Sequence, residues 1–227
     1  MTVVLDIAAD GHRPALRVRP WLAADMPDLL AAMEREHPEA GLRSHRDVRV
    51  PGQRRWSGPR NDKEADLWLS GQQHGWDHGD WLTFAVLDAR RNRAVGHVGL
   101  WNRDGGRVGT GGRAEIGYWT AADARGRGIA PAAVRAVTDW ALSSFGAELL
   151  PNIMLVHDLD NAASCRVAIK SGYPFREVSP ANPPYWFTDG HIHVAEAVVG
   201  WQVEIADRLG HRKTMWAPQR RAERRAV

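Results

Sequence analysis

The chain has 227 residues, of which 44% are hydrophobic and 25% charged, with a formal net charge of +3. This ordinary globular composition predicts a packed core and excludes a wholly disordered chain, and the length suits one sizeable domain. A single cysteine, Cys165, excludes an intrachain disulfide framework and any zinc site built from several cysteines. No apolar run approaches the roughly 18 residues that cross a bilayer, so we expect a cytoplasmic protein with no membrane partner.

The first part of the chain predicts one strand and two helices. Residues 15–21 alternate as in a strand, and helical spacing follows over 24–36 until a His-Pro pair ends it. The segment 41–60 is rich in Arg, Gly and Pro and has little periodicity, as in a long functional loop. Helical spacing returns over 62–73, and three glycines after it predict the end of that helix.

The remaining elements predict a sheet with helices around it. They are strands over 81–88, 94–101 and 113–120, a helix that Gly146 ends, a strand over 152–158, a helix over 161–172 and a last strand over 191–204. The first three strands form an antiparallel meander. We therefore predict an α+β, or mixed α/β, fold with a central mixed, largely antiparallel sheet flanked by helices.

The end of the chain is strongly basic, since seven Lys and Arg residues fall between Arg208 and Arg225. We divide the chain into a single domain over 1–207 and a basic C-terminal tail over 208–227. Such a tail could contact nucleic acid or an acidic partner, but a solvated, frayed terminus is the commoner case. We do not expect nucleic-acid binding.

A glycine-containing turn connects the third meander strand to the helix that follows. The turn reads ARGRGIA over 124–130. The first N–H groups of a helix point outward with the positive end of the helix dipole behind them, and such a site binds phosphate. Gly126 and Gly128 permit positive φ and close approach of a ligand, while Arg125 and Arg127 add charge. A simple capping turn with solvated arginines is the alternative.

Two familiar phosphate loops do not match this turn. A P-loop needs Lys-Ser or Lys-Thr after its glycines, and neither pair is present. A dinucleotide fingerprint needs Gly or Ala at its third position, where this chain has Pro131, and it opens a βαβ unit rather than following a meander.

What remains is R-x-x-G-x-A, formed by Arg125, Gly128 and Ala130, with EIGYW before it and DNAASCRVAIKSGY over 160–173 after it. These three motifs, in this order, resemble the GNAT superfamily of acyl-CoA-dependent N-acyltransferases. They are most similar to its Rim-type branch, which acetylates N-terminal amines of ribosomal proteins and has relatives that act on small amines. Two positions depart from the branch: Pro131 begins the helix, and Ala122 replaces a usual proline.

The resemblance implies a GNAT-type sheet, acyl-CoA as co-substrate, most simply acetyl-CoA, and direct attack of a primary amine on the thioester in a ternary complex. It assigns pyrophosphate binding to Arg125, Gly126, Arg127, Gly128, Ile129 and Ala130, and pantetheine binding to Tyr118, Trp119 and Thr120. The same strand end is expected to offer an N–H to the oxyanion. Asn161 and Ser164 match positions that contact the pantetheine arm and the sulfur, and Ser164 is the candidate partner of the leaving thiolate. Either side chain could instead serve the backbone at a helix start.

Glu115 lies on the strand before the loop and is the candidate base that accepts the amine proton, directly or through water. The alternative is a structural carboxylate paired with one of the many arginines. His157, at a strand end, is a weaker candidate base. Tyr173 is expected in the core.

We expect no metal. Cys165 is interpreted as a packed thiol, because direct transfer needs no acyl-enzyme. His74 and His78 sit four residues apart, and His191 and His193 share a strand face, but neither pair has an obvious third ligand.

The sequence leaves the catalytic competence, the acceptor, the oligomeric state and the role of several tryptophans open. A non-catalytic acyl-CoA-binding or regulatory module of the same fold would retain the loop without the chemistry. The acceptor is either a small-molecule amine or a peptide N-terminus, and a homodimer is compatible with the sequence. Tryptophans 56, 68, 76 and 81 fall near several acidic residues. Aromatic faces with nearby carboxylates suit an ammonium acceptor, or else these tryptophans fill the core.

Overall fold

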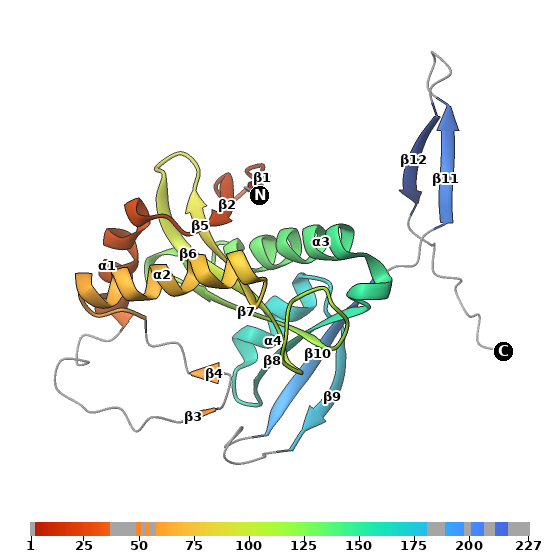
Figure 1. The fold of residues 1–227 in the computed structure, drawn as a ribbon. Coiled ribbons are helices and arrows are strands. Elements are labelled where there is room, and N and C mark those ends of the chain that lie inside the picture. The colour runs from red at the N-terminus through yellow and green to blue at the C-terminus, as the bar shows by residue number, and fades with distance from the viewer. Residues whose placement is uncertain are drawn as a thin grey trace.

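The structure is a computed structural model, and it describes residues 3–36, 49–50, 53–54, 58–180, 189–197, 201–206 and 212–217. Its centre is an eight-stranded sheet in the order β1-β2-β5-β6-β7-β8-β10-β9, with helices packed around it (Figure 1). These strands are β1 Leu5–Ile7, β2 Leu16–Pro20, β5 Trp81–Asp88, β6 Arg93–Asn102, β7 Ala114–Thr120, β8 Asn152–Asp158, β9 Phe175–Ser179 and β10 Gly190–Glu196. Every neighbouring pair is antiparallel except β7 and β8, which are parallel.

The helices are α1 Met26–Glu36, α2 Asp62–His78, α3 Ile129–Leu149 and α4 Ala162–Lys170, with short 3-10 turns at η1 Ala23–Asp25 and η2 Ala122–Ala124. Two small sheets pair β3 Arg49–Val50 with β4 Gln53–Arg54, and β11 Trp201–Ala206 with β12 Arg212–Ala217. The mixed α+β class and the largely antiparallel sheet are confirmed. Among the described residues, no helix combines the length and apolar character that crossing a membrane requires.

Strand register assigns the helices to the two faces of the sheet. Phe84, Val98 and Tyr118 lie opposite one another on neighbouring strands and share a face, because side chains alternate along each strand. Trp140 of α3 packs on Phe84, with ring centroids 5.4 Å apart. On the opposite face the hydroxyl of Thr83 donates to Gln72 of α2 at 2.8 Å. We call these the α3 face and the α2 face.

The prediction that glycines end α2 near residue 73 is wrong. The helix runs to His78 and ends at Gly79, whose φ of 76° and ψ of 13° are left-handed. Gly75 is a packing residue: a Cβ there would lie 2.2 Å from Nε1 of Trp81. At the N-terminus of α2, Asn61 is an ordinary N-cap, since its side chain accepts from the N–H of Glu64.

Two further boundaries differ from prediction. Gly146 kinks α3 with a φ of 73°, and the helix then continues to Leu149. The predicted last strand is divided, because β10 ends at Glu196 and β11 pairs with β12 instead. Strands β1 and β9 were not predicted. In β9 the side chains of Phe175, Arg176, Glu177 and Val178 are all exposed, so no apolar alternation marks it.

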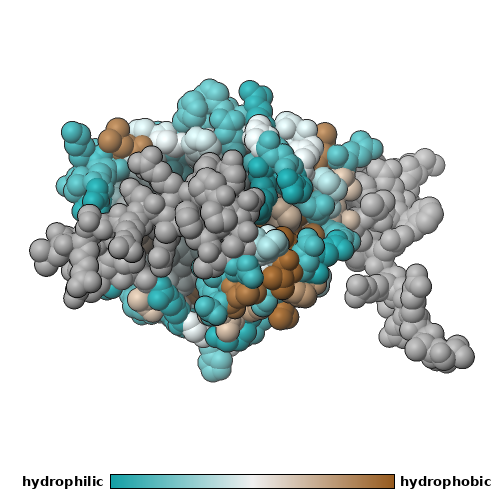
Figure 2. Space-filling model, turned by 90° about the horizontal axis from the view of Figure 1, so that it is seen from below, coloured by the Kyte–Doolittle hydropathy of each residue, from teal (hydrophilic) through white to brown (hydrophobic). Residues whose placement is uncertain are grey.

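Most of the predicted loop over 41–60 and most of the predicted tail lie outside the described residues. The exceptions are β3, β4 and residues 58–60 in the loop, and β12, which falls beyond the boundary placed at residue 207. The division into a domain over 1–207 and a tail stays a prediction. Figure 2 shows one face of the molecule, on which hydrophilic residues predominate among the coloured ones and the largest hydrophobic group lies near the lower centre.

Tyr173 is fully buried, and its hydroxyl lies 2.6 Å from Oγ1 of Thr138, as expected for a core residue. Burial raises the pKa of this phenol. Thr138 also donates to the carbonyl of Val134, so it keeps a partner when the phenol is removed. We expect Tyr173→Phe to lower the free energy of unfolding by about 1 kcal/mol without changing turnover, as urea denaturation and a rate assay would report. A loss of turnover in a folded variant would place Tyr173 in the site instead.

Candidate functional site

Strands β7 and β8 pair only where they begin. The register joins Ala114 to Ile153 and Glu115 to Met154, and no later pair follows. From Ile116 to Thr120, β7 is paired with β6 on one edge, while its other edge has no strand partner among the described residues. Strand β8 pairs instead along its whole length with β10. The free edge of β7 therefore leaves main-chain amides next to α4 for a ligand to pair with.

The side chains of Tyr118 and Ser164 connect β7 to α4 beside this free edge. The phenol of Tyr118 donates to Oγ of Ser164 at 2.8 Å, and Ser164 is only 5% exposed. Burial raises the pKa of Tyr118, so the phenol keeps its proton at neutral pH. Because Oγ of Ser164 already accepts from Tyr118, its own proton is free to be donated to a third group.

Asn161 is the N-cap of α4, which is one of the two roles that the sequence left open for it. Its Oδ1 accepts from the N–H of Ser164 at 3.0 Å, as an N-cap does. The cap places Ser164 in the first turn of the helix. Contact of Asn161 with pantetheine stays a prediction.

Glu115 is 3% exposed and pairs with Arg103, whose Nη1 lies 3.0 Å from the carboxylate. The sequence could not identify this partner. Arg103 directly follows β6, at the start of the glycine-rich connection to β7. Glu115 and Tyr118 are three residues apart on one strand, so their side chains point to opposite faces. Glu115 lies on the α2 face and Ser164 on the α3 face, and the structure does not bring the two side chains into contact.

The turn between β7 and α3 has the positive-φ backbone conformation that its glycines predicted. Gly126 and Gly128 have φ values of 75° and 72°, a conformation that residues with a Cβ rarely adopt. A Cβ at Gly126 would meet nothing within 4 Å, and one at Gly128 only Cδ of Arg13 at 3.9 Å. The side chain of Arg125 folds back to donate to the carbonyl of Thr120 at 3.0 Å. The backbone of this turn is thus open to an approaching ligand.

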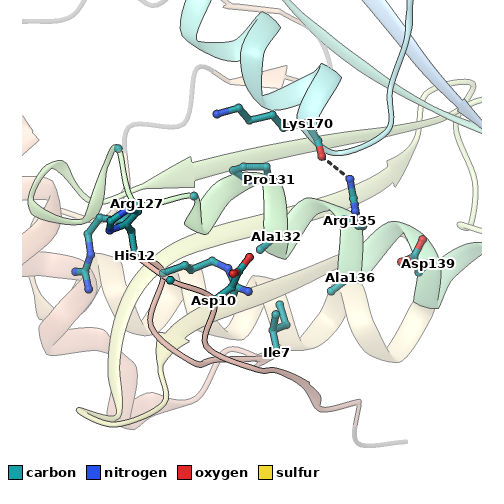
Figure 3. Close-up of a pocket in the computed structure, with 14 residues that line it drawn as sticks. Ile7, Asp10, His12, Arg127, Pro131, Ala132, Arg135, Ala136, Asp139 and Lys170 are labelled. Carbon is teal, nitrogen blue, oxygen red and sulfur yellow. Dashed lines mark hydrogen bonds between the residues drawn. The ribbon is translucent and has the colours of Figure 1, made fainter.

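A pocket of about 670 Å³ adjoins the glycine turn. Figure 3 shows its walls, which are the loop after β1, the turn itself and one side of α3. Four cationic side chains line it, namely Arg13, Arg127, Arg135 and Lys170, against the acids Asp10 and Asp139. Arg135 donates to the carbonyl of Lys170 at 2.6 Å, which joins α3 to the end of α4. Sequence reasoning found only Arg127, because the other three come from separate segments without a shared motif.

The tryptophans on and near α2 are engaged in packing. Trp68 packs edge-on against Trp21 at 5.2 Å, and Trp76 lies 5.1 Å from Phe84 and donates to the carbonyl of Thr83. Trp101 lies across Gly117, where a Cβ would come within 2.8 Å of its ring. For Trp68 and Trp76, the alternative that the tryptophans fill the core is therefore the one that the structure supports, and Trp56 lies outside the described residues.

His97 lies among these tryptophans, and Nε1 of Trp21 donates to its Nδ1 at 3.1 Å. Burial lowers the pKa of His97 from 6.5 to about 4. Between these values the unfolded chain binds a proton that the folded chain does not, so stability is complete above about pH 6.5 and falls as the pH drops toward 4. We expect His97→Gln, which can still accept from Trp21, to reduce this loss in urea unfolding at pH 7 and pH 5. The loss does not vanish, because burial also lowers the pKa of His193. An equal loss in both proteins would contradict the assignment.

His157 lies away from the candidate base. It is three residues after Met154, the partner of Glu115 in the register, so its ring points to the α3 face and Glu115 to the α2 face. The structure therefore does not bring these two candidate bases together.

Three comparisons relate the chain to known proteins. Residues 15–174 match the family model described as "Acetyltransferase (GNAT) domain". A search of curated proteins finds no match. Among solved structures, the chain is similar to Mycobacterium smegmatis RimJ in complex with CoA-disulfide, with 21% identity over 86% of this chain and 87% of that one and a TM-score of 0.62.

Two other solved structures share the fold, with similarly low sequence identity. One is the ribosomal-protein-S5-alanine acetyltransferase from Vibrio fischeri, with 17% identity, 85% of this chain and 97% of that one covered, and a TM-score of 0.60. The other is a GNAT-family acetyltransferase from Bacillus anthracis, with 15% identity, 85% and 99% covered, and a TM-score of 0.59.

Proposed function

The chain belongs to the GNAT acetyltransferase family, and on this premise we propose that it moves an acetyl group from acetyl-CoA to a primary amine. The observation that carries the proposal is the free edge of β7 beyond Glu115. This edge lies beside the hydroxyls of Tyr118 and Ser164 and leads into the glycine turn. A long ligand with amides in its middle and phosphates at one end fits this order of groups.

In the proposed complex, the N–H groups at Gly126 to Ala130 bind the pyrophosphate, because this turn leads into the N-terminus of α3 and the space beside Gly126 and Gly128 is open. The pantetheine amides pair with β7 at Tyr118, Trp119 and Thr120, along the edge that has no strand partner among the described residues. The 3′-phosphate and adenosine end occupies the basic pocket beside the turn, whose four cationic side chains complement phosphate. The thioester then lies near Ser164.

The two faces of β7 separate the two halves of the reaction. The amine approaches from the α2 face, where Glu115 accepts its proton directly or through water, and attacks the thioester carbonyl. A C–N bond forms, and a main-chain N–H of β7 stabilises the tetrahedral oxyanion. The C–S bond then breaks, and Ser164 donates a hydrogen bond or its proton to the departing thiolate. A donated proton is replaced on Oγ by the phenol proton of Tyr118, and solvent returns one to the phenol. No acyl-enzyme forms.

We infer that the acceptor is a peptide N-terminus or a small amine, as in the Rim-type branch. The similar structures include proteins whose names state ribosomal-protein acetylation, which supports this choice of acceptor class. A non-catalytic acyl-CoA-binding module is the second candidate, because the glycine turn and the pocket alone would suffice for binding.

Thiol release from acetyl-CoA distinguishes the two candidates. The purified chain is mixed with acetyl-CoA and with a panel of N-terminal peptides and small amines, and free CoA is detected with a thiol reagent. An acetyltransferase releases CoA faster when one class of amine is added. A binding module binds acetyl-CoA in calorimetry but shows no amine-dependent release with any member of the panel.

A further inference from the structure

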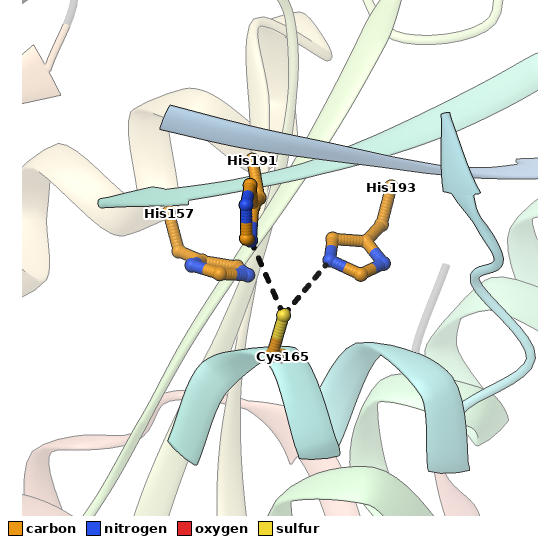
Figure 4. A group of neighbouring side chains, drawn as sticks. All are labelled: His157, Cys165, His191 and His193. Carbon is orange, nitrogen blue, oxygen red and sulfur yellow. Dashed lines mark hydrogen bonds between the residues drawn. The ribbon is translucent and has the colours of Figure 1, made fainter. Parts of the chain in front are cut away.

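Four side chains that could ligate a metal converge between α4 and the strands β8 and β10. They are His157 of β8, Cys165 of α4, and His191 and His193 of β10, and their ligand atoms all lie within 4.8 Å of one another (Figure 4). The group lies on the α3 face of the sheet, beside the proposed acetyl-transfer site but not part of it. None of the steps proposed for acetyl transfer uses these residues.

The strand register explains why the three histidines meet. His157 is directly opposite His191 in the antiparallel pair of β8 and β10, so both rings leave the same face. His193 is two residues further along β10 and therefore shares that face. Helix α4 packs against both strands and presents Cys165 to the rings. Neither histidine pair seen in the sequence had a third ligand, and this register supplies it.

The distances suit a tetrahedral site. Sγ of Cys165 lies 3.3 Å from Nδ1 of His191 and 3.5 Å from Nε2 of His193. A zinc ion binds nitrogen at about 2.0–2.1 Å and sulfur at about 2.3 Å, so the corners of its tetrahedron are about 3.3–3.6 Å apart. The sulfur and these two ring nitrogens are already at that separation.

Hydrogen bonds to the far sides of two rings orient them as ligands. Nδ1 of His157 lies 2.8 Å from the carbonyl of Asp158, and Nδ1 of His193 lies 3.1 Å from the carbonyl of Tyr173. A ring nitrogen facing a carbonyl must carry the proton, so Nε2 of each ring carries a lone pair directed into the group. Zinc-binding histidines commonly show this second hydrogen bond to a backbone carbonyl.

The Nε2 atom of His157 gives independent support. His157 is 8% exposed, and its Nε2 is buried with no hydrogen-bond partner among the described residues. A buried polar atom without a partner costs free energy, and such atoms are rare in folded proteins. A cation at the centre of the four side chains would satisfy this atom.

We propose that His157, Cys165, His191 and His193 bind one zinc ion in a closed tetrahedral site. A set of one thiolate and three imidazoles suits zinc, and four protein ligands leave no open position for a substrate, as in structural sites. The ion ties α4 to β8 and β10. Since Ser164 precedes Cys165 in α4, the site holds the helix that positions the proposed thiolate partner. The proposal replaces our expectation that the protein has no metal, and it does not depend on the proposed acetyl transfer.

Metal content and cobalt spectra test the site. The full chain is purified with its affinity tag removed, exchanged into metal-free buffer with one equivalent of zinc or cobalt, and passed over a desalting column. We expect about one equivalent of zinc per chain by elemental analysis. The cobalt form should show intense visible bands of tetrahedral geometry and a thiolate-to-cobalt charge-transfer band.

The variants separate this site from incidental binding. Cys165→Ser should abolish the charge-transfer band, and His193→Gln should weaken zinc binding by more than about 100-fold, beyond the usual effect of a second-sphere change. The matched control is His74→Gln with His78→Gln on α2, an exposed stacked pair that should leave the metal content unchanged. A chelator should lower the melting temperature of the wild type and of this control, but not that of His193→Gln.

Two results would overturn the proposal. One is a folded wild-type chain that retains no zinc or cobalt after the exchange. The other is retention of one equivalent that Cys165→Ser and His193→Gln leave unchanged in both affinity and spectrum, because the ion would then bind elsewhere.

Discussion

Replacing Ser164 with alanine should lower kcat by about 10² to 10⁴, the range for a positioned proton-transfer group, while acetyl-CoA affinity changes much less. Tyr118 donates its phenol proton to Oγ of Ser164, so the hydroxyl proton of Ser164 is left to be donated to the thiolate. The variant removes this proton. Raising the pH does not help a thiolate to leave, so the loss should persist across the pH profile of kcat/KM. Tyr118→Phe serves as the comparison, because Ser164 keeps its hydroxyl there and loses only its orientation, and we expect a smaller loss.

Glu115→Gln should lower kcat within the same range, but its dependence on pH should differ. A higher pH supplies free amine and replaces part of the work of a base, so the variant should partly recover. Glutamine keeps an acceptor for Arg103, which limits the cost of removing the carboxylate beside that partly buried cation. Arg103→Gln is the matched control: if Glu115 is only a structural partner, both variants should lose stability and activity together. Rates near wild type for Ser164→Ala and Glu115→Gln across the pH range would refute these roles.

Gly128→Val should weaken acetyl-CoA binding by at least about 10²-fold with the fold retained, because the substitution would remove several of the phosphate contacts that we propose at this helix N-terminus. Valine disfavours the φ of 72° that Gly128 adopts and places a branched side chain where the ligand approaches. Calorimetry with acetyl-CoA measures the dissociation constant, and circular dichroism reports the fold.

Gly79→Val controls for backbone strain in this experiment. Gly79 has nearly the same conformation, with φ 76° and ψ 13° against φ 72° and ψ 13°, but ends α2 away from the turn. Both variants should lose similar stability, and only Gly128→Val should lose acetyl-CoA binding. An unchanged dissociation constant in Gly128→Val would contradict the assignment of the turn.

The residues that sequence reasoning found lie in contiguous motifs. Examples are the turn at 124–130 and the start of α4 at Asn161 and Ser164. Such features can be predicted from a few consecutive residues, because a glycine turn or a helix cap is formed by residues close together in the sequence. The three strands of the meander were found for the same reason, since each is a short apolar run bounded by turn residues. The fold class followed from the order of these elements.

What the sequence did not reveal depends on contacts between distant segments. Arg103 meets Glu115, and Arg13 meets the glycine turn, only after the sheet has formed. The convergence of His157 with His191 depends on the register of β8 and β10, which no local pattern encodes. Gly75 was interpreted as a helix breaker. The position requires a glycine because the ring of Trp81 packs on it, and this contact is not visible in the sequence.

Single-turnover analysis tests direct acetyl transfer most directly. Excess enzyme is mixed with acetyl-CoA and the best acceptor from the amine panel, quenched at short times, and the masses of enzyme and acceptor are measured. We predict that acetylated acceptor and free CoA appear together, one for one, with no acetylated enzyme at any time. An enzyme species carrying an acetyl group that forms before the product and decays into it would contradict direct transfer. CoA release without any acetylated acceptor would contradict the transferase function itself.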